Sequence, residues 1–422
     1  MENHIYQTYI QILKEELVPA MGCTEPIALA YCASLCKDTL EEDVMSANIY
    51  VSGNIIKNVK SVIVPNTGGL KGITASVSAG IVAGDSHKIL EVIASVTPKQ
   101  KENIKTFMEN VPMKVIPIES EAALDISVEL IGEHHQAKVQ ISGFHTNVVL
   151  IEKDKEIIFE LGVVHCEECD VADRSLLNVQ DIYDFACEVN IEDVEEVLQR
   201  QIDYNLAIAK EGLAHDYGAN IGSILLSTYG EDVKIKAKAY AAAGSDARMS
   251  GCELPVIINS GSGNQGMTAS LPVIVYALEE NVTKEQLYRA LIISNLCTIH
   301  QKTGIGRLSA YCGAVSAGVG AGCGIAYLQG GDYKTISHTL VNALAITSGI
   351  VCDGAKPSCA AKIAESVDAG ILGYYMYVNN CQFKGGDGIV CKGVENTIKN
   401  IGRLSREGMK ETDKEIIKMM CD

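Results

Sequence analysis

The stretch that decides the fold reads NLCTIHQKTGIGRLSAYCGAVSAGVGAGCGIAYLQGG over residues 295–331, and ITSGIVCDGAKPSCAAKI follows over residues 346–363. It is rich in Gly and Ala, and no charged side chain stands between Arg307 and Asp332. Small residues let two backbones approach closely, and cysteines beside such backbones are soft ligands for a metal centre. The stretch therefore predicts closely packed helices with a candidate metal centre among five cysteines: Cys297, Cys312, Cys323, Cys352 and Cys359.

The uncharged run at residues 308–331 is long enough to cross a bilayer, which raises a membrane transporter as an alternative. Most of the run is Gly, Ala and Ser, and strongly apolar aliphatic residues are few. Small residues at this spacing also suit packed membrane helices, but the sequence has no second comparable run. The composition therefore favours a buried helix in a water-soluble protein and no membrane partner.

Length and charge narrow the class of protein. A chain of 422 residues predicts two or three domains, each able to bury a core. The net charge of −18 argues against nucleic acid as a partner. The first residues, MENHIYQTYIQILKEEL, lack the apolar segment of a signal peptide, so we expect a cytoplasmic protein. In that compartment most of the 15 cysteines stay reduced, as core residues, metal ligands or catalytic groups.

The order of periodic segments predicts an α+β fold. Residues 3–17 have the period of an amphipathic helix, whereas residues 46–64 and 113–161 alternate as strands do. Beyond residue 193 the pattern is helical and almost free of strands. We predict a smaller mixed α/β domain at 1–190, whose N-terminal helices at 1–40 pack on the active site. A mainly helical, Gly/Ala-rich domain at 191–422 then carries the candidate metal centre.

Three cysteines have the spacing of a metal site. Cys352 and Cys359 flank DGAKPS, in which Pro and Gly keep the connector non-helical, so both sulfurs can face one point. Cys312 stands at the start of the small-residue helix. Three thiolates suit a [4Fe–4S] cluster with one open iron, whereas a closed set of four suits electron transfer or structural zinc. An open iron can act as a Lewis acid on a substrate.

Other cysteines divide into a reactive candidate and core candidates. Cys23, in GCTEP at 22–26, precedes a helix, and the helix dipole there favours the thiolate. Core packing stays its alternative. Cys32 and Cys36, further inside that helix, are expected to pack in the core. The CxxC at 166–169 could be half of a zinc site or a redox pair, but we favour a solvent-side loop because acids flank it.

The stretch SGSGNQG at 260–266 contains a formal GxGxxG. A dinucleotide site requires a strand before it and an unbroken helix after it, but Pro272 falls in that helix. A loop that binds a small carboxylate fits better. Lys302 and Arg307 could hold the same carboxylate, or could be surface helix-cap charges. His145 falls in or beside a turn of the predicted sheet, and nothing nearby completes a set of metal ligands.

Five motifs together resemble the L-cysteine desulfidase family over nearly the whole chain. They are GCTEP at 22–26, SDARMSGCELPV at 245–256, SGSGNQG at 260–266, KTGIGRLSAYCGA at 302–314 and CDGAKPSC at 352–359. That family is related to the α-domain of iron–sulfur L-serine dehydratases. The resemblance implies a lyase that needs no pyridoxal phosphate. It would convert L-cysteine to pyruvate, ammonia and sulfide by α,β-elimination at a [4Fe–4S] cluster.

The resemblance also implies roles for single residues. Cys312, Cys352 and Cys359 match the cluster cysteines, and Cys23 matches the cysteine proposed as catalytic base. The SGSGNQG loop matches the substrate-holding stretch of the dehydratases, which points to Ser260, Ser262 and Asn264. A further hypothesis is that Cys421 caps the open iron in the resting state. L-serine as the substrate, a non-catalytic carboxylate-binding protein and assembly into homo-oligomers stay open.

Overall fold

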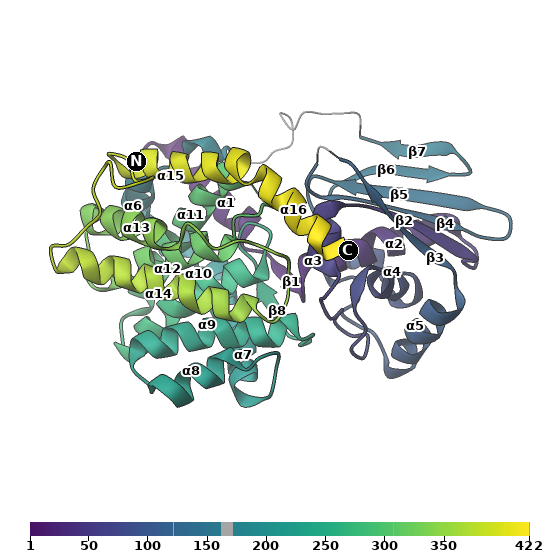
Figure 1. Cartoon of the computed structure of the whole chain (residues 1–422), viewed down its shortest axis with the longest axis horizontal. Coiled ribbons are helices and arrows are strands. Elements are labelled where there is room, and N and C mark those ends of the chain that lie inside the picture. The colour runs from purple at the N-terminus through teal and green to yellow at the C-terminus, as the bar shows by residue number, and fades with distance from the viewer. Residues whose placement is uncertain (121, 162–171, 307, 422) are drawn as a thin grey trace.

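The computed structural model describes residues 1–120, 122–161, 172–306 and 308–421, with only the backbone of Cys421. A β-sheet with its covering helices lies beside a larger bundle of helices, so the predicted α+β fold is confirmed (Figure 1). We call these the sheet part and the helical part. The last helix lies across both of them, and its C-terminal end is at the sheet part.

The sheet part is built on six strands in the order β3-β2-β4-β5-β6-β7. Strands β2 and β3 run parallel, and the other neighbours are antiparallel. Along β5 the side chains of Ala137, Val139 and Ile141 are buried at every second position, as the alternating sequence predicts. The strand bounds are β2 Ser46–Ser52, β3 Met113–Ile118, β4 Asp125–Ile131, β5 Gln136–Ser142, β6 Val148–Lys153 and β7 Glu156–Glu160.

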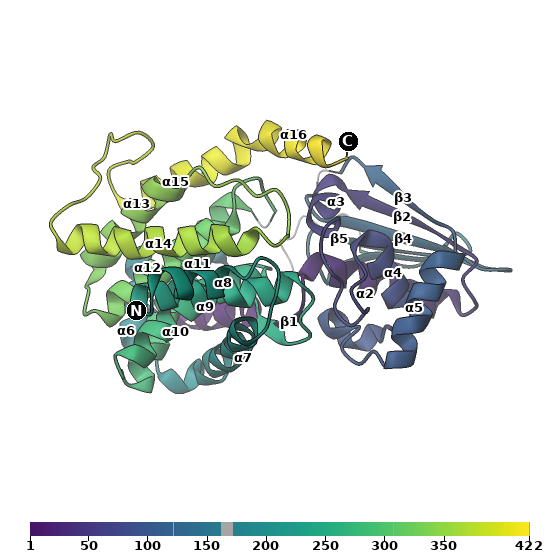
Figure 2. The same cartoon turned by 60° about the horizontal axis from the view of Figure 1, so that its bottom comes forward.

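Helices cover one face of this sheet (Figure 2). They are α2 (Thr24–Leu40), α4 (Gly72–Ala83) and α5 (Pro98–Asn110), with the short 3-10 helix η1 (Ser86–Glu91) beside them. Cys32 and Cys36 of α2 are fully buried against β4 and β5, which confirms their predicted place in the core. The start of α2 is free of the sheet and lies toward the helical part.

The strand predicted over residues 46–64 is wrong in its second half. Strand β2 ends at Ser52, and α3 (Gly53–Val59) follows it. Ile55 and Val59 are both fully buried and stand four positions apart, a spacing that one helical face also satisfies. The mixed sequence NIIKNV cannot separate the two periods, and tertiary packing selects the helix.

The helical part contains most of the helices. Their bounds are α1 Asn3–Glu16, α6 Val179–Glu188, α7 Glu195–Ala214, α8 Ile221–Tyr229, α9 Val233–Met249, α10 Gly263–Glu279, α11 Lys284–Ile305, α12 Gly313–Leu328, α13 Tyr333–Thr347, α14 Cys359–Val378, α15 Val394–Arg403 and α16 Lys410–Cys421. Short 3-10 turns occur at η2 (Arg174–Leu176) and η3 (Ile191–Asp193), and a π-helical turn, η4 (Leu404–Gly408), joins α15 to α16.

The small-residue helix α12 is the centre of the helical part. It packs against α10, α11, α13 and α14, and its interior residues are buried. A Cβ at Gly322 would lie 2.6 Å from the carbonyl oxygen of Gly370 in α14, so only glycine allows this approach of the two backbones. The Gly/Ala-rich composition is therefore a packing requirement. Among the described residues, no helix has both the length and the apolarity needed to cross a membrane.

A two-stranded antiparallel sheet ties the chain start to the helical part. Strand β1 (Pro19–Met21) pairs with β8 (Pro255–Ile257), the one strand among the described residues beyond residue 193, in line with the expectation of an almost strand-free second half. The buried Tyr9 of α1 packs edge-on against Phe185 of α6. This pairing brings Cys23 next to the residues that follow β8. The domain limits at 190 and 191 stay a prediction.

Candidate functional site

A cavity of about 100 Å³ lies where the sheet part meets the helical part. All the predicted site residues that the structure describes line this cavity. They are Cys23, Ser260, Ser262, Asn264, Lys302, Cys312, Cys352 and Cys359. Arg307 lies outside the described residues, as do Cys166 and Cys169. Segments that are far apart in the sequence thus meet around one small space, and we take this cavity as the candidate site.

Backbone pairing brings Cys312 and Cys352 together. Tyr311 and Val351 form an antiparallel bridge. The Cys312 N–H donates to the Ile350 carbonyl at 3.2 Å, and the Cys352 N–H donates to the Ala310 carbonyl at 2.6 Å. Cys312 is also the N-cap residue of α12. The bridge therefore fixes the two thiols beside each other at the start of the central helix.

The loop 352–359 closes the third side of the cavity. Gly354 has φ +94°, and a Cβ there would lie 2.1 Å from the Lys57 carbonyl oxygen, so the loop packs on α3 only with glycine. The Asp353 carboxylate accepts from Lys362, which begins the next turn of α14, and so anchors the loop. Cys359 is the first residue of α14, and its thiol lies 3.6 Å from the Gly354 carbonyl oxygen.

The two paired thiols have opposite acidities. The hydrogen bond that Cys312 donates lowers the pKa of Cys352 to about 6, and the positive charges of Lys57 and Lys302 act in the same direction. The same hydrogen bond raises the pKa of Cys312. Thiolates are the form that binds metals. The site therefore already stabilises one thiolate among the three cysteines.

The cysteines of the cavity suit an iron–sulfur cluster better than a single metal ion. Among the residues the structure describes, no three His, Cys, Asp or Glu side chains are grouped as ligands of a single metal ion. An iron–sulfur cluster spreads its thiolate ligands over several irons, so its ligands stand further apart. Three cysteines around one cavity, next to Lys57 and Lys302, fit such a cluster better than a single ion.

Cys23 faces this set from the N-terminal end of α2. It is the N-cap residue of that helix, is 3% exposed, and packs with Met249, Ala355 and Cys359. The predicted low pKa of its thiol is wrong. Burial raises the pKa of Cys23 well above its usual value, and the Glu25 carboxylate raises it further. Loss of water outweighs the favourable helix dipole here.

Glu25 is a site residue that the sequence analysis missed. Its side chain is buried, and its Oε2 accepts from the Cys23 thiol at 3.2 Å. Its Oε1 accepts from Asn58 Nδ2 at 2.9 Å, and Thr24 Oγ1 lies 3.1 Å from Oε2. The sequence signal that could have identified Glu25 is a carboxylate two positions after a cysteine at the start of a helix. The thiol of Cys23 therefore has a proton acceptor within hydrogen-bonding distance.

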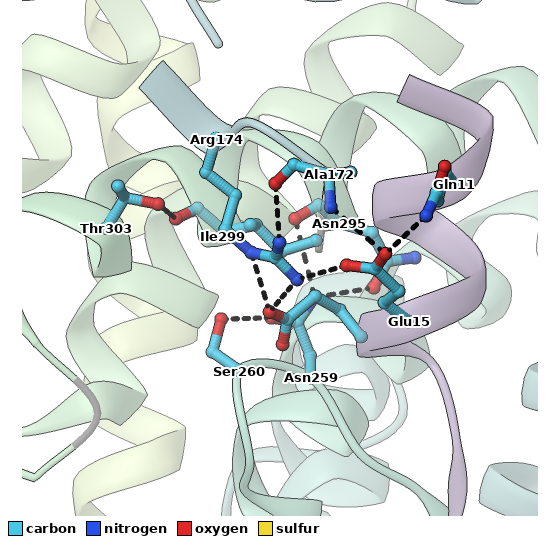
Figure 3. A network of polar contacts seen from close by, with 10 residues as sticks. Gln11, Glu15, Ala172, Arg174, Asn259, Ser260, Asn295, Ile299 and Thr303 are labelled. Atoms are coloured by element: carbon cyan, nitrogen blue, oxygen red, sulfur yellow. Dashed lines mark hydrogen bonds and ion pairs between the residues drawn. The ribbon is translucent and has the colours of Figure 1, made fainter. Parts of the chain in front are cut away.

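The loop 260–266 is held rigidly beside the cavity. Ser260 has φ +50°, and its hydroxyl donates to Asn259 Oδ1 at 2.9 Å. Asn259 donates in turn to Asn295 Oδ1 of α11 at 3.0 Å (Figure 3). Strand β8 before the loop is antiparallel and short, and Pro272 lies inside α10. The loop is therefore not built as a dinucleotide-binding unit, in line with the sequence-based preference.

Three further cavity residues were missed. Arg248 of α9 is 2% exposed, and its Nε donates to the Gly22 carbonyl at 2.9 Å. Lys57 is 1% exposed and pairs with Asp413 of α16. His145 lines the cavity and is buried, a place that its position beside a turn of the sheet did not indicate. Of these three residues, only Arg248 had a signal in the sequence, because an Arg within the Ala-rich sequence of α9 is unusual for a buried helix.

Comparisons with known proteins identify the family to which the chain belongs. The serine dehydratase alpha chain family matches residues 87–418. The chain belongs to this family. It is 61% identical to a UPF0597 protein of Desulfitobacterium hafniense, over 100% of this chain and 98% of the relative. UPF0597 proteins of Lachnoclostridium phytofermentans and Fusobacterium nucleatum are 51% and 42% identical, over at least 99% of this chain and 100% of each relative. Membership supports a lyase-type function.

Proposed function

We propose that this protein is an iron–sulfur-dependent lyase that works without pyridoxal phosphate. It would carry out α,β-elimination on L-cysteine and release pyruvate, ammonia and hydrogen sulfide. The observation that carries the proposal is the meeting of Cys23 with Cys312, Cys352 and Cys359 around one cavity, in a chain of this family. A [4Fe–4S] cluster held by the last three would supply a Lewis-acidic iron.

The residues of the chain account for the first proton transfers. The α-proton of an amino acid is only weakly acidic, so a base must be placed against it. In the proposal the Cys23 thiol gives its proton to Glu25, whose Oε2 is 3.2 Å away. The thiolate then takes the α-proton, and the C–S bond breaks with its electron pair on sulfur. The resulting 2-aminoacrylate hydrolyses to pyruvate and ammonia.

The surroundings of Cys23 suit this role. The thiol is 3% exposed, which keeps bulk water from protonating the base. Arg248 and Lys302 bring positive charge to the cavity, which offsets the negative charge of a bound carboxylate. A cytoplasmic location suits the proposal, because the cysteines must stay reduced to bind iron.

L-serine is the second candidate substrate, and the match to the serine dehydratase alpha chain family favours it. The two amino acids differ by one atom in the leaving group. The elimination would use the same base and the same cluster, and water would leave in place of sulfide. The ratio of kcat/KM for the two substrates decides between them.

The proposal is tested on protein purified without oxygen. We expect a brown protein that contains iron and inorganic sulfide, and that releases sulfide and pyruvate in equal amounts from L-cysteine. Pyruvate from L-serine is measured in parallel. A colourless protein that is inactive on both amino acids after iron and sulfide reconstitution would contradict the proposal.

A further inference from the structure

Among the buried polar atoms of the candidate site that have no hydrogen-bond partner, which also include the Tyr311 hydroxyl, two have opposite hydrogen-bonding character. Arg248 Nη2 is a donor and Gln265 Oε1 is an acceptor, and neither has a hydrogen-bond partner among the described residues. Their side chains are 2% and 6% exposed, and both residues line the cavity. Buried polar atoms are nearly always paired in native proteins, so two unpaired ones in one cavity point to a ligand.

Both side chains are held in place by their surroundings. Arg248 donates through Nε to the Gly22 carbonyl at 2.9 Å, and through Nη1 to Asn264 Oδ1 at 3.0 Å. A Cβ at Gly263 would lie 2.4 Å from Arg248 Nε. A Cβ at Gly313 would lie 2.6 Å from Cδ of Gln265. Two glycines thus leave the room that these side chains occupy, which is the preorganisation expected of a binding site.

The two atoms match the two charged groups of an α-amino acid. A guanidinium N–H binds a carboxylate with a charge-assisted hydrogen bond, and an amide oxygen accepts from an ammonium group. We propose that Arg248 binds the α-carboxylate of the substrate and that Gln265 binds its α-ammonium group. This assignment rests on the proposed function and names the residues that select an amino acid at that site.

The assignment differs from the sequence-based one. Ser260 was expected to hold the carboxylate, but its hydroxyl already donates to Asn259. Asn264 accepts from Arg248, so its Oδ1 positions the guanidinium and does not contact the carboxylate directly. In this arrangement the sequence-predicted loop supports Arg248, which makes the direct contact.

The test uses three ligands that share a thiol. L-cysteine has both charged groups, cysteamine lacks the carboxylate, and 3-mercaptopropionate lacks the ammonium group. Binding is measured by calorimetry without oxygen, in a Cys23→Ala background that prevents turnover. Arg248→Lys and Gln265→Leu are compared with Arg403→Lys, a surface change on α15. Circular dichroism checks that each variant is folded.

We expect Arg248→Lys to weaken binding of L-cysteine and 3-mercaptopropionate about 10- to 100-fold, and to leave cysteamine unchanged. Gln265→Leu should weaken binding of L-cysteine and cysteamine, and leave 3-mercaptopropionate unchanged. Equal effects of a variant on all three ligands, or none, would overturn the assignment of that residue. If Arg248→Lys does not fold, the Gln265→Leu pattern and the ligand comparison in the parent protein decide the question.

The inference and the proposed function can fail separately. A lyase that is active on L-cysteine but shows no ligand-specific pattern keeps the function and loses the inference. A protein without lyase activity that shows the full pattern keeps the amino-acid site and loses the proposed reaction.

Discussion

Two helices each carry a cysteine at the start and at least one more in the interior, and the two kinds of position have different surroundings. In α2, Cys23 is the N-cap residue and Cys36 lies inside the helix. In α12, Cys312 is the N-cap residue and Cys323 lies inside. Both N-cap cysteines line the cavity, and both interior cysteines are fully buried in hydrophobic clusters. In both helices the N-cap position, and not the interior position, places a thiol at the cavity.

The hydrogen bonds explain the difference. The Cys36 thiol donates to the carbonyls of Val128 and Ala137, both at 3.3 Å, and burial raises the pKa of Cys36 to about 12. Such a thiol stays protonated and unreactive. The cavity thiols have other partners: Cys23 donates to a carboxylate, and Cys352 accepts from Cys312 near two lysines. The Cys36 thiol is therefore paired with backbone carbonyls of the sheet, whereas Cys23 and Cys352 are paired with side chains that line the cavity.

The largest contrast is expected within α2. Cys23→Ala should lower kcat on L-cysteine by about 10²- to 10⁴-fold, because the proposed base is removed, and should leave the iron content unchanged. Cys32→Ala, a core change in the same helix, is the matched control and should retain turnover. Iron per chain and pyruvate release are measured on both. Loss of iron from Cys23→Ala would make Cys23 a ligand and not a base.

The Glu25→Gln variant separates two effects of Glu25 on the Cys23 thiol: its influence on the thiol pKa and its proposed role as acceptor of the thiol proton. The Glu25 charge raises the pKa of Cys23, so its removal should lower that pKa and let iodoacetamide alkylate the thiol at lower pH. Turnover should nevertheless fall roughly 10- to 100-fold, because the group that accepts the thiol proton is lost. Mass spectrometry of the Cys23 peptide follows alkylation against pH. Glu41→Gln, an exposed change after α2, is the control, and unchanged turnover in Glu25→Gln would remove Glu25 from the proposed mechanism.

Lys57→Met should weaken the cluster site to a smaller extent. The Lys57 charge lowers the pKa of Cys352, so its loss raises that pKa and makes protons compete with iron at a higher pH. We expect iron loss to a chelator to be roughly 3- to 10-fold faster, and the gap to widen as the pH falls. Lys60→Met, on the exposed side of the same segment, should behave as the unchanged protein does. Equal rates at every pH would contradict the electrostatic role of Lys57.

The smallest effect on activity is expected in the core. Cys297 and Cys323 are fully buried and hydrogen-bonded to each other between α11 and α12. Cys297→Ala should lower the free energy of unfolding by about 1–2 kcal/mol, because it removes buried atoms and a hydrogen-bond partner. Iron content and kcat should stay unchanged. Urea unfolding measures the change in the free energy of unfolding. If Cys297→Ala lost iron without losing stability, the division into core cysteines and cavity cysteines would be wrong.

Sequence patterns predicted the elements that depend on local periodicity. Strands form between residues 113 and 161 as predicted, with the clearest alternation of buried residues along β5, and the small-residue helix α12 is central as expected. The strand predicted over the second half of 46–64 was wrong, because the spacing of Ile55 and Val59 is compatible with a strand and with a helix. Strand β8 is too short to leave a periodic pattern.

The cysteines of the site could be predicted from the sequence, but the residues that contact them could not. Cys312, Cys352 and Cys359 stand at recognisable breaks between helices, so their convergence could be expected. Glu25 and Arg248 are placed in the cavity by contacts with Asn58 and with the Gly22 carbonyl, which are distant in the sequence, so the local signals at these two residues were not enough to assign them to the site. The direction of the pKa shift of Cys23 was predicted wrongly, because its burial depends on Met249 and Cys359, which are distant in the sequence and pack against the helix start.

The most direct test of the account is the iron content of six alanine variants purified together without oxygen. The account predicts that Cys312→Ala, Cys352→Ala and Cys359→Ala lose most of their iron, and that Cys36→Ala, Cys297→Ala and Cys323→Ala retain it. Equal iron in the two groups, or loss confined to the core variants, would contradict the assignment of the cavity as the iron–sulfur site.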